Sequence, residues 1–216
     1  MDYSLHRNYF NTAYKTGTDI WTHLPIDIRG AKLMGKLSAG ATVLDIGSGR
    51  GIFAKKLAET GFKVIGIDSE SEIVANTNKE VENWGLSGRV KFMVADALEL
   101  PFVDESFDGV CALGLMENIH PEDWPKYADE VKRVLKPGGF YLNMSFSRKT
   151  RNFMKFSPID SPDGEFQKHG VHYHFFEEEE MKNIFNKKFT LISQDVLFVK
   201  DPIEIALLES LFQKPK

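Results

Sequence analysis

The feature that most constrains this 216-residue chain is a run of three glycines at alternate positions, Gly47-Ser48-Gly49-Arg50-Gly51. The apolar residues Val43, Leu44 and Ile46 precede it, and residues 52–60 carry apolar side chains on one helical face. This order predicts a buried parallel strand, a tight turn and a helix. Glycines let a ligand approach the backbone, and a helix N-terminus offers free N–H groups to an anion. The stretch therefore predicts an α/β fold with a nucleotide-binding turn.

The spacing of the glycines separates two classes of nucleotide site. A dinucleotide-binding turn, G-x-G-x-x-G, places its third glycine where this chain has Ile52. Here the third glycine, Gly51, comes one residue earlier, which argues against a nicotinamide-dependent oxidoreductase. A tight turn that binds no ligand is the alternative interpretation of this stretch alone.

Composition limits the remaining classes. Hydrophobic residues make up 42% of the chain and charged residues 27%, as is usual for a soluble globular protein. The net charge of −4 argues against general nucleic-acid binding, so DNA is not an expected partner. Cys111 is the single cysteine, which excludes an internal disulfide and fits a reducing compartment. Because no apolar run has the length of a signal peptide or a membrane span, we expect a cytoplasmic protein without membrane contact.

Strand and helix patterns alternate along the chain with short connections, which predicts a doubly wound parallel sheet with helices on both faces. The expected strands are residues 63–68, 90–96, 109–115, 140–146 and 189–199, and the expected helices are 28–37, 71–84, 121–136 and 177–185.

Three motifs lie in an order and spacing that resemble one family. They are D-I-G-S-G-R-G at residues 45–51, L-P-F-V-D-E-S-F-D at 100–108 and L-K-P-G-G at 135–139. Residues 41–146 thereby resemble class I S-adenosylmethionine (SAM) methyltransferases of the small-molecule, type 11-like kind. The resemblance implies a Rossmann-like, mostly parallel sheet of seven strands with one antiparallel strand. It also implies SAM as cofactor and S-adenosylhomocysteine as product.

The expected organisation is a single domain over residues 1–216. Residues 1–40 form an N-terminal helical lid, 41–146 the cofactor-binding core, 147–176 a substrate cap after the fifth strand, and 177–216 a C-terminal helix and strands. Residues 203–212 are ambiguous, because their composition favours a helix whereas the resemblance implies a closing antiparallel strand. We favour the strand.

Acidic residues at the ends of expected strands are candidate cofactor ligands. Asp68 follows Gly51 by 17 positions and can accept hydrogen bonds from both ribose hydroxyls, or cap the next helix. The resemblance places Asp96 and the Ala97 backbone at the adenine ring. Tyr14 and Trp21 either pack on the cofactor or cap the sheet. The predicted cofactor-binding residues are Asp45, Gly47, Ser48, Gly49, Gly51, Asp68, Ser69, Asp96, Ala97, Leu113, Tyr14 and Trp21.

The expected reaction is an in-line displacement at an activated sulfonium, for which the protein mainly supplies proximity and alignment. A hydroxyl acceptor also needs a general base. Glu117 and His120 follow the strand at 109–115 and are the catalytic candidates, although the same positions also fit ordinary loop residues.

Motifs that the chain lacks narrow the acceptor. No Asn-Pro-Pro-Tyr motif, Pro-Cys pair or aspartate cluster follows the fourth or fifth strand, so methylation of nucleic-acid bases and magnesium-dependent catechol methylation are not expected. The chain is therefore predicted to transfer a methyl group to a small-molecule acceptor without a metal. A protein or RNA methyltransferase that uses the 147–176 cap and a non-catalytic SAM-binding partner subunit are the alternatives.

The 147–176 segment holds two further features. Its basic cluster around Arg148 either attracts an anionic substrate or forms a solvated face. The pattern His169-x-x-His172-x-His174 suggests metal ligands, but no cysteine or clear fourth ligand accompanies it. We therefore predict that these histidines line a pocket, and no metal site is expected.

Overall fold

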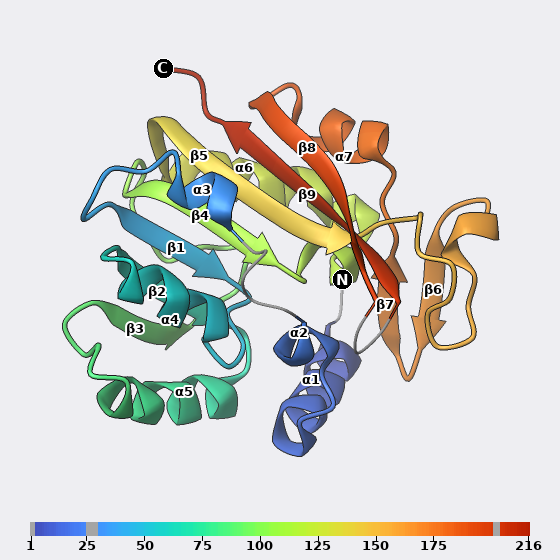
Figure 1. Ribbon diagram of the computed structural model, residues 1–216, viewed down its shortest axis with the longest axis horizontal. Helices are drawn as coiled ribbons and strands as arrows, with labels where there is room; N and C mark the ends of the chain where they lie inside the picture. Colours follow the sequence, from blue (N-terminus) through green and yellow to red (C-terminus); the bar gives the residue numbers. More distant parts are fainter. Residues whose placement is uncertain (1–2, 25–29, 201–203) are drawn as a thin grey trace.

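The computed structural model describes residues 3–24, 30–200 and 204–216. A seven-stranded sheet forms its centre (Figure 1). The strands are β1 (Thr42–Ile46), β2 (Lys63–Asp68), β3 (Val90–Val94), β4 (Phe107–Leu113), β5 (Leu135–Phe146), β8 (Thr190–Val199) and β9 (Ile205–Gln213). Their order is β3-β2-β1-β4-β5-β9-β8, and only β9 runs antiparallel to its neighbours. The predicted fold is confirmed, and β9 shows that the ambiguous C-terminal segment is a strand.

Helices cover both faces of the sheet. The helices are α1 (Ser4–Thr16), α2 (Ile20–His23), α3 (Ala31–Met34), α4 (Ile52–Glu59), α5 (Ser71–Asn83), α6 (Trp124–Val134) and α7 (Glu178–Phe185), with short 3-10 turns η1 (Met116–Asn118), η2 (Pro121–Asp123) and η3 (Pro158–Asp160). The buried residues of α3, α4 and α5 share one hydrophobic cluster, and those of α6 and α7 share the cluster on the opposite face. The doubly wound arrangement therefore follows from apolar stripes at helical spacing.

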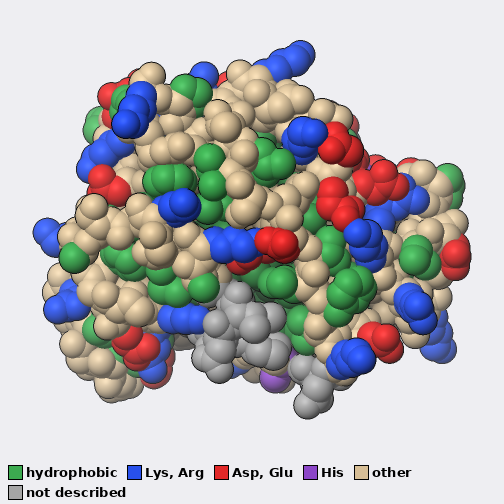
Figure 2. All heavy atoms as spheres, turned by 45° about the horizontal axis from the view of Figure 1, so that its top comes forward, with side chains coloured by type: hydrophobic (Ala, Val, Ile, Leu, Met, Phe, Trp, Pro, Cys, Tyr) green, Lys and Arg blue, Asp and Glu red, His purple; other side chains and the backbone are tan. Residues whose placement is uncertain are grey.

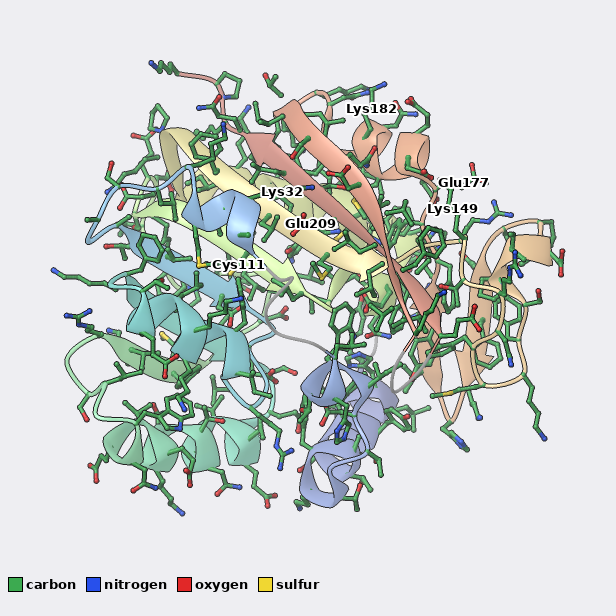
Figure 3. All side chains as sticks on the ribbon, viewed as in Figure 1. Lys32, Cys111, Lys149, Glu177, Lys182 and Glu209 are labelled. Atoms are coloured by element: carbon green, nitrogen blue, oxygen red, sulfur yellow. The ribbon has the colours of Figure 1, made fainter. Side chains whose placement is uncertain are left out.

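An ion pair links helix α3 to strand β9 of the sheet. Lys32 of α3 points toward Glu209 of β9 (Figure 3), and its Nζ lies 2.8 Å from Glu209 Oε2. Glu209 is only 3% exposed, so the lysine neutralises a carboxylate that burial would otherwise destabilise.

Several expected boundaries differ from the observed ones. The helix expected at 121–136 begins as η2, continues as α6 and ends at Val134, and β5 starts at Leu135 instead of residue 140. Its residues 136–139 form a bulge against β4, because Leu135 pairs with Phe107 and Phe140 with Gly109. The helix expected at 28–37 is described only as α3, since Gly35 and the following turn end it, and residues 28 and 29 lie outside the described residues.

The segment 147–176 contains a hairpin that the sequence analysis missed. Strands β6 (Glu165–Lys168) and β7 (Val171–His174) pair antiparallel, and β7 lies between β6 and α1 (Figure 1). His169 and Gly170 form its two-residue turn, with φ of 54° and 77°. Two positive φ values are what a type I′ hairpin turn requires. His169 is therefore a turn residue. Its ring stacks on Tyr9 rather than lying near the other two histidines of the motif.

Candidate cofactor site

A cavity of about 350 Å³ lies where β1, β2 and β3 end. This is the edge at which open α/β sheets bind ligands, and the volume lies in the usual range for small-molecule sites. Predicted residues that line it are Gly47, Asp68, Ser69, Asp96, Ala97 and Tyr14. A second hollow of about 60 Å³ adjoins it and is lined by Asp45, Ser48, Gly49, Leu113 and Trp21. Gly47 and Tyr14 line both, so eleven of the twelve predicted cofactor residues surround one continuous region.

The first two glycines of the turn, Gly47 and Gly49, allow its backbone to face the hollow. Gly47 and Gly49 have φ of 72° and 49°, in the left-handed region. A Cβ at Gly49 would lie 2.9 Å from the Tyr14 hydroxyl, so a larger residue would collide with α1. The Gly49 N–H donates a hydrogen bond to Asp68 Oδ2 over 2.9 Å, which joins the turn to the end of β2.

Gly51 is the predicted cofactor residue that lines neither hollow. A Cβ there would lie 2.5 Å from the Phe92 ring and 2.7 Å from Thr77 Cγ2. Its part in the structure is to bring the start of α4 close to β3 and α5.

We expect Gly51→Ala to lower the free energy of unfolding by about 2 kcal/mol or more, since overpacking adds to the strain of a positive φ. Gly85→Ala is the matched control, because Gly85 has the same φ of 69° and a Cβ added there would meet no atom within 4 Å. It should lose only about 1 kcal/mol. Urea unfolding of both variants measures the difference, and equal losses would contradict the packing role.

Two buried carboxyl groups lie beside the turn. Asp68 accepts from the N–H groups of Gly49 and Glu70, and burial raises its pKa. Asp45 is 2% exposed, and burial raises its pKa to about 7. The Cys111 thiol, at the centre of the sheet (Figure 3), donates to Asp45 Oδ1 over 3.5 Å. Both carboxyls are therefore held as acceptors at the edge of the cavity.

The N-terminal helix α1 contributes a wall that the sequence analysis mostly missed. Tyr3, His6, Phe10 and Tyr14 line the 350 Å³ cavity, together with Arg7. Only Tyr14 was predicted, although the spacing of three and four residues is typical of one helical face. His6 Nε2 is buried without a hydrogen-bond partner among the described residues, and burial lowers the pKa of His6 to about 4.

Trp21 takes a different place from Tyr14. A Cβ at Gly114 would lie 2.2 Å from its indole, so Trp21 rests directly on the end of β4. Its ring also stacks on Phe146, with centroids 5.4 Å apart and planes 18° apart. Trp21 therefore caps the sheet and also lines the smaller hollow, and its packing on the cofactor stays a prediction.

The candidate catalytic residues lie behind the cavity. Glu117 on η1 is fully buried, and neither carboxylate oxygen has a hydrogen-bond partner among the described residues. Burial raises its pKa to about 8, while the nearby Ser145 and Trp21 side chains lower it. His120 is half-buried, and its backbone N–H donates to the Tyr3 hydroxyl over 3.1 Å. Their neighbours Asn118 and Ile119 line the 350 Å³ cavity, whereas Glu117 and His120 do not.

Comparison with known proteins shows which family this domain resembles. Residues 43–139 match the family model described as a methyltransferase domain. Over 140 residues, 62% of this chain, it is 36% identical to a ubiquinone/menaquinone biosynthesis C-methyltransferase, UbiE, from Pseudomonas fluorescens. The chain contains a class I SAM-dependent methyltransferase domain. SAM is therefore the cofactor of this domain, as the resemblance implied.

The matches to curated relatives cover only part of each relative's length. Methyltransferase GfsG from Streptomyces halstedii is 41% identical over 104 residues, 48% of this chain and 37% of the relative. The match to UbiE covers 51% of that protein, so the chain spans about half the length of the curated relatives it matches.

Solved structures agree on the fold of the methyltransferase domain. A SAM-dependent methyltransferase from Methanosarcina mazei superposes with a TM-score of 0.76 and 25% identity, over 86% of this chain and 98% of that one. The 1,6-didemethyltoxoflavin-N1-methyltransferase of Burkholderia thailandensis, bound to 1,6-didemethyltoxoflavin and S-adenosylhomocysteine, gives 0.80 at 23% identity, over 99% and 88%. Among the described residues, none of the helices combines the length and apolar character that crossing a bilayer requires.

Proposed function

We propose that this protein transfers the methyl group of SAM to a small, planar ring compound that carries an acidic O–H or N–H, with Glu117 as general base. The supporting observation is the buried Glu117 carboxyl beside the end of β4, whose oxygens lack a hydrogen-bond partner among the described residues. A carboxylate whose pKa is raised to about 8 is a stronger base than an ordinary glutamate, so Glu117 should act as a base once it is ionised, and its rate should rise as the pH approaches 8. His120, whose backbone N–H donates to the Tyr3 hydroxyl, is the second candidate for the same role.

The cofactor would occupy the two adjoining hollows. In this placement Asp68 accepts from the ribose hydroxyls and Asp96 from the adenine amino group, with Ser69 and Ala97 beside them. The methionine part lies along Gly47, Ser48 and Gly49, near Asp45. Leu113, Tyr14 and Trp21 enclose the sulfonium end. The lining of the two hollows by these residues supports the placement.

The acceptor class follows from the surroundings of Glu117. Trp21 lies beside Glu117 and lines the smaller hollow, so its indole offers an aromatic surface that favours a flat ring. The UbiE relatives are named as quinone-biosynthesis C-methyltransferases, which fits the same chemistry. In the proposed step Glu117 takes the acceptor proton, the acceptor attacks the methyl carbon, and the carbon–sulfur bond breaks to leave S-adenosylhomocysteine. The sulfonium is already activated, so this displacement needs no metal.

A macromolecular acceptor is less well supported by the surface. On the face shown in Figure 2, basic and acidic side chains are interspersed. Two members of the basic cluster in the 147–176 segment are paired, Arg148 with Glu177 at 2.6 Å and Lys149 with Glu178. Such paired charges form a solvated face rather than a nucleic-acid surface.

The first test is calorimetric titration with SAM, S-adenosylhomocysteine and NADH, followed by turnover with methyl-labelled SAM. We expect micromolar binding of both adenosyl compounds, no binding of NADH, and labelled product with some members of a panel of hydroquinones and hydroxylated heterocycles. Cofactor binding without any labelled product would favour a non-catalytic SAM-binding subunit. Label found only in added protein or RNA would contradict the small-molecule acceptor.

A further inference from the structure

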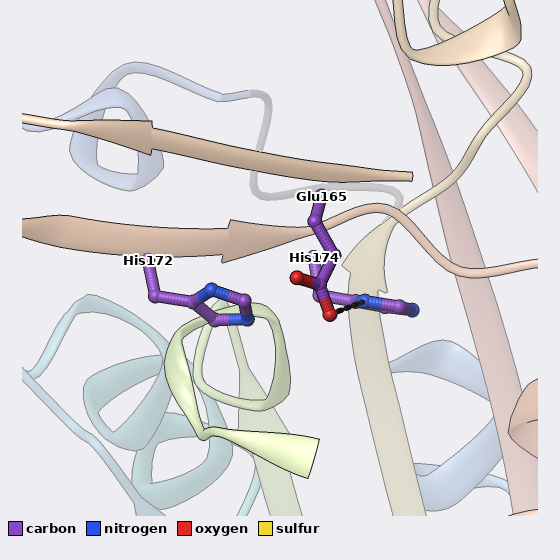
Figure 4. A group of neighbouring side chains, drawn as sticks. All are labelled: Glu165, His172 and His174. Carbon is purple, nitrogen blue, oxygen red and sulfur yellow. Dashed lines mark ion pairs between the residues drawn. The ribbon is translucent and has the colours of Figure 1, made fainter. Parts of the chain in front are cut away.

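One face of the β6–β7 hairpin gathers three side chains that can ligate a metal. His172 and His174 are two residues apart in β7, so they share a face of the strand, and Glu165 pairs directly with His174 across the hairpin. One ligand atom from each of the three lies within 4.8 Å of the others (Figure 4). Glu165 Oε1 lies 3.7 Å from His174 Nδ1.

Both imidazoles are buried, and each has one ring nitrogen without a hydrogen-bond partner among the described residues. His172 is 6% exposed and His174 3%. His172 Nε2 and His174 Nδ1 are both buried and lack a hydrogen-bond partner among the described residues. An unsatisfied buried polar group costs about 1–3 kcal/mol, so two in one cluster require an explanation.

The other nitrogen of His174 is already engaged. His174 Nε2 lies 3.0 Å from both carboxylate oxygens of Glu180, to which it donates. This contact leaves the Nδ1 lone pair directed at Glu165. Metal-ligating histidines commonly donate their second ring N–H to a carboxylate in this way, which fixes the tautomer and the ring orientation.

We propose that Glu165, His172 and His174 bind a divalent first-row transition metal such as Zn²⁺, with Glu180 as the supporting carboxylate. Two imidazoles and one carboxylate are a common zinc ligand set, with the remaining position taken by water. Ligand bonds of about 2.0–2.2 Å require the three atoms to draw together by about 1 Å. Glu165 is an exposed residue with a long side chain, so it can make most of this movement.

The site has an opening and a favourable charge. A surface recess of about 430 Å³ is lined by His174, by Arg148 and by four carboxylates, Asp163, Glu165, Glu177 and Glu180. Arg148 pairs with Glu177, so the other three carboxylates give the recess a net negative charge that attracts a cation. Sequence spacing alone does not indicate this cluster, because its third member comes from the partner strand and His169 occupies the hairpin turn.

The metal would brace the hairpin against the catalytic edge of the sheet. The His172 ring stacks on His120, with centroids 4.7 Å apart, and its carbonyl accepts from Asn118 Nδ2 over 2.8 Å. Asn118 lines the cofactor cavity. The cation thus fixes the position of β7 and takes no part in methyl transfer.

The test uses full-length protein made without a histidine tag and freed of metal with a chelator. Co²⁺ is titrated and followed by its visible absorption, and Zn²⁺ affinity is measured by competition with a chromophoric chelator. We expect one equivalent of metal to bind. Glu165→Gln and His172→Ala should each lower Zn²⁺ affinity by about 100-fold or more, and Glu180→Gln by about 10- to 100-fold.

His169→Ala is the matched control, since it removes a histidine from the same hairpin without touching the cluster, and its affinity should equal that of the parent protein. Thermal unfolding of each metal-free variant checks the fold, and the exposed Glu165 makes Glu165→Gln safe in this respect. Two results would overturn the site: no stoichiometric binding at about 10 μM metal, or equal affinities for Glu165→Gln and His169→Ala.

Discussion

Replacing Glu117 with glutamine should reduce methyl transfer by about 100-fold or more, while SAM affinity stays within about threefold. The substitution keeps the shape of a fully buried side chain but removes its ability to take a proton. General bases typically contribute 10²- to 10⁴-fold to a rate. The cofactor is unaffected because Glu117 does not line the cavity assigned to it.

The measurement is kcat with a saturating acceptor, beside calorimetric titration of SAM. Glu122→Gln is the control, because Glu122 lies on the adjacent turn η2 but is exposed. It should retain full activity. If Glu117→Gln also keeps its kcat, the role of general base passes to His120 or is not needed.

The same substitution should change how stability depends on pH. Burial raises the pKa of Glu117 from 4.5 to about 8, so the folded protein holds a proton that the unfolded chain releases. Stability contributed by the neutral carboxyl is complete below pH 4.5 and declines as the pH rises to 8, by roughly 1.4 kcal/mol per unit. Glu117→Gln removes this decline. Urea unfolding at pH 6 and pH 8 should therefore show the variant gaining relative to the parent.

Replacing Asp68 with alanine should weaken binding of SAM and S-adenosylhomocysteine by about 100-fold or more. In the proposed placement of the cofactor, the substitution removes two charge-assisted hydrogen bonds to the ribose, each worth about 1.5–3 kcal/mol. A loss of about 3 kcal/mol corresponds to a factor of more than 100 in affinity. The turn also loosens, because the Gly49 N–H loses its acceptor.

Calorimetry on three variants separates these effects. Asp68→Asn keeps one carbonyl acceptor and should show an intermediate loss. Glu82→Gln removes a negative charge from the exposed face of α5 and should bind as the parent does. An affinity of Asp68→Ala within threefold of the parent would remove Asp68 from the ribose site.

Local patterns made the centre of the fold predictable. β1, the glycine turn and α4 follow one another within about 18 residues, so sequence spacing alone sets their geometry. The same holds for Asp68 at the end of β2, which the structure places on the cavity. The closing strand β9 came from the resemblance, since its composition favours a helix.

Contacts between distant segments could not be predicted in this way. The β6–β7 hairpin lacks a clear alternation of apolar residues, and its pairing of Glu165 with His174 depends on the turn at His169 and Gly170. The surroundings of Glu117 include Trp21, which lies nearly a hundred residues earlier in the chain. Gly51 matched the motif for a ligand site, but its surroundings involve Phe92 on a separate strand.

The position of α1 also has a kinetic consequence. Tyr3 and Tyr14 lie on the cavity, and Tyr3 is held by its hydrogen bond to Asp123 at 2.8 Å. Near its other end, Lys15 of α1 pairs with Glu72 of α5. As the lid proposed for residues 1–40, α1 would have to move aside for product to leave and SAM to enter, a motion that takes microseconds to milliseconds in many enzymes. Its opening rate would then set an upper limit on turnover, however fast the methyl group is transferred.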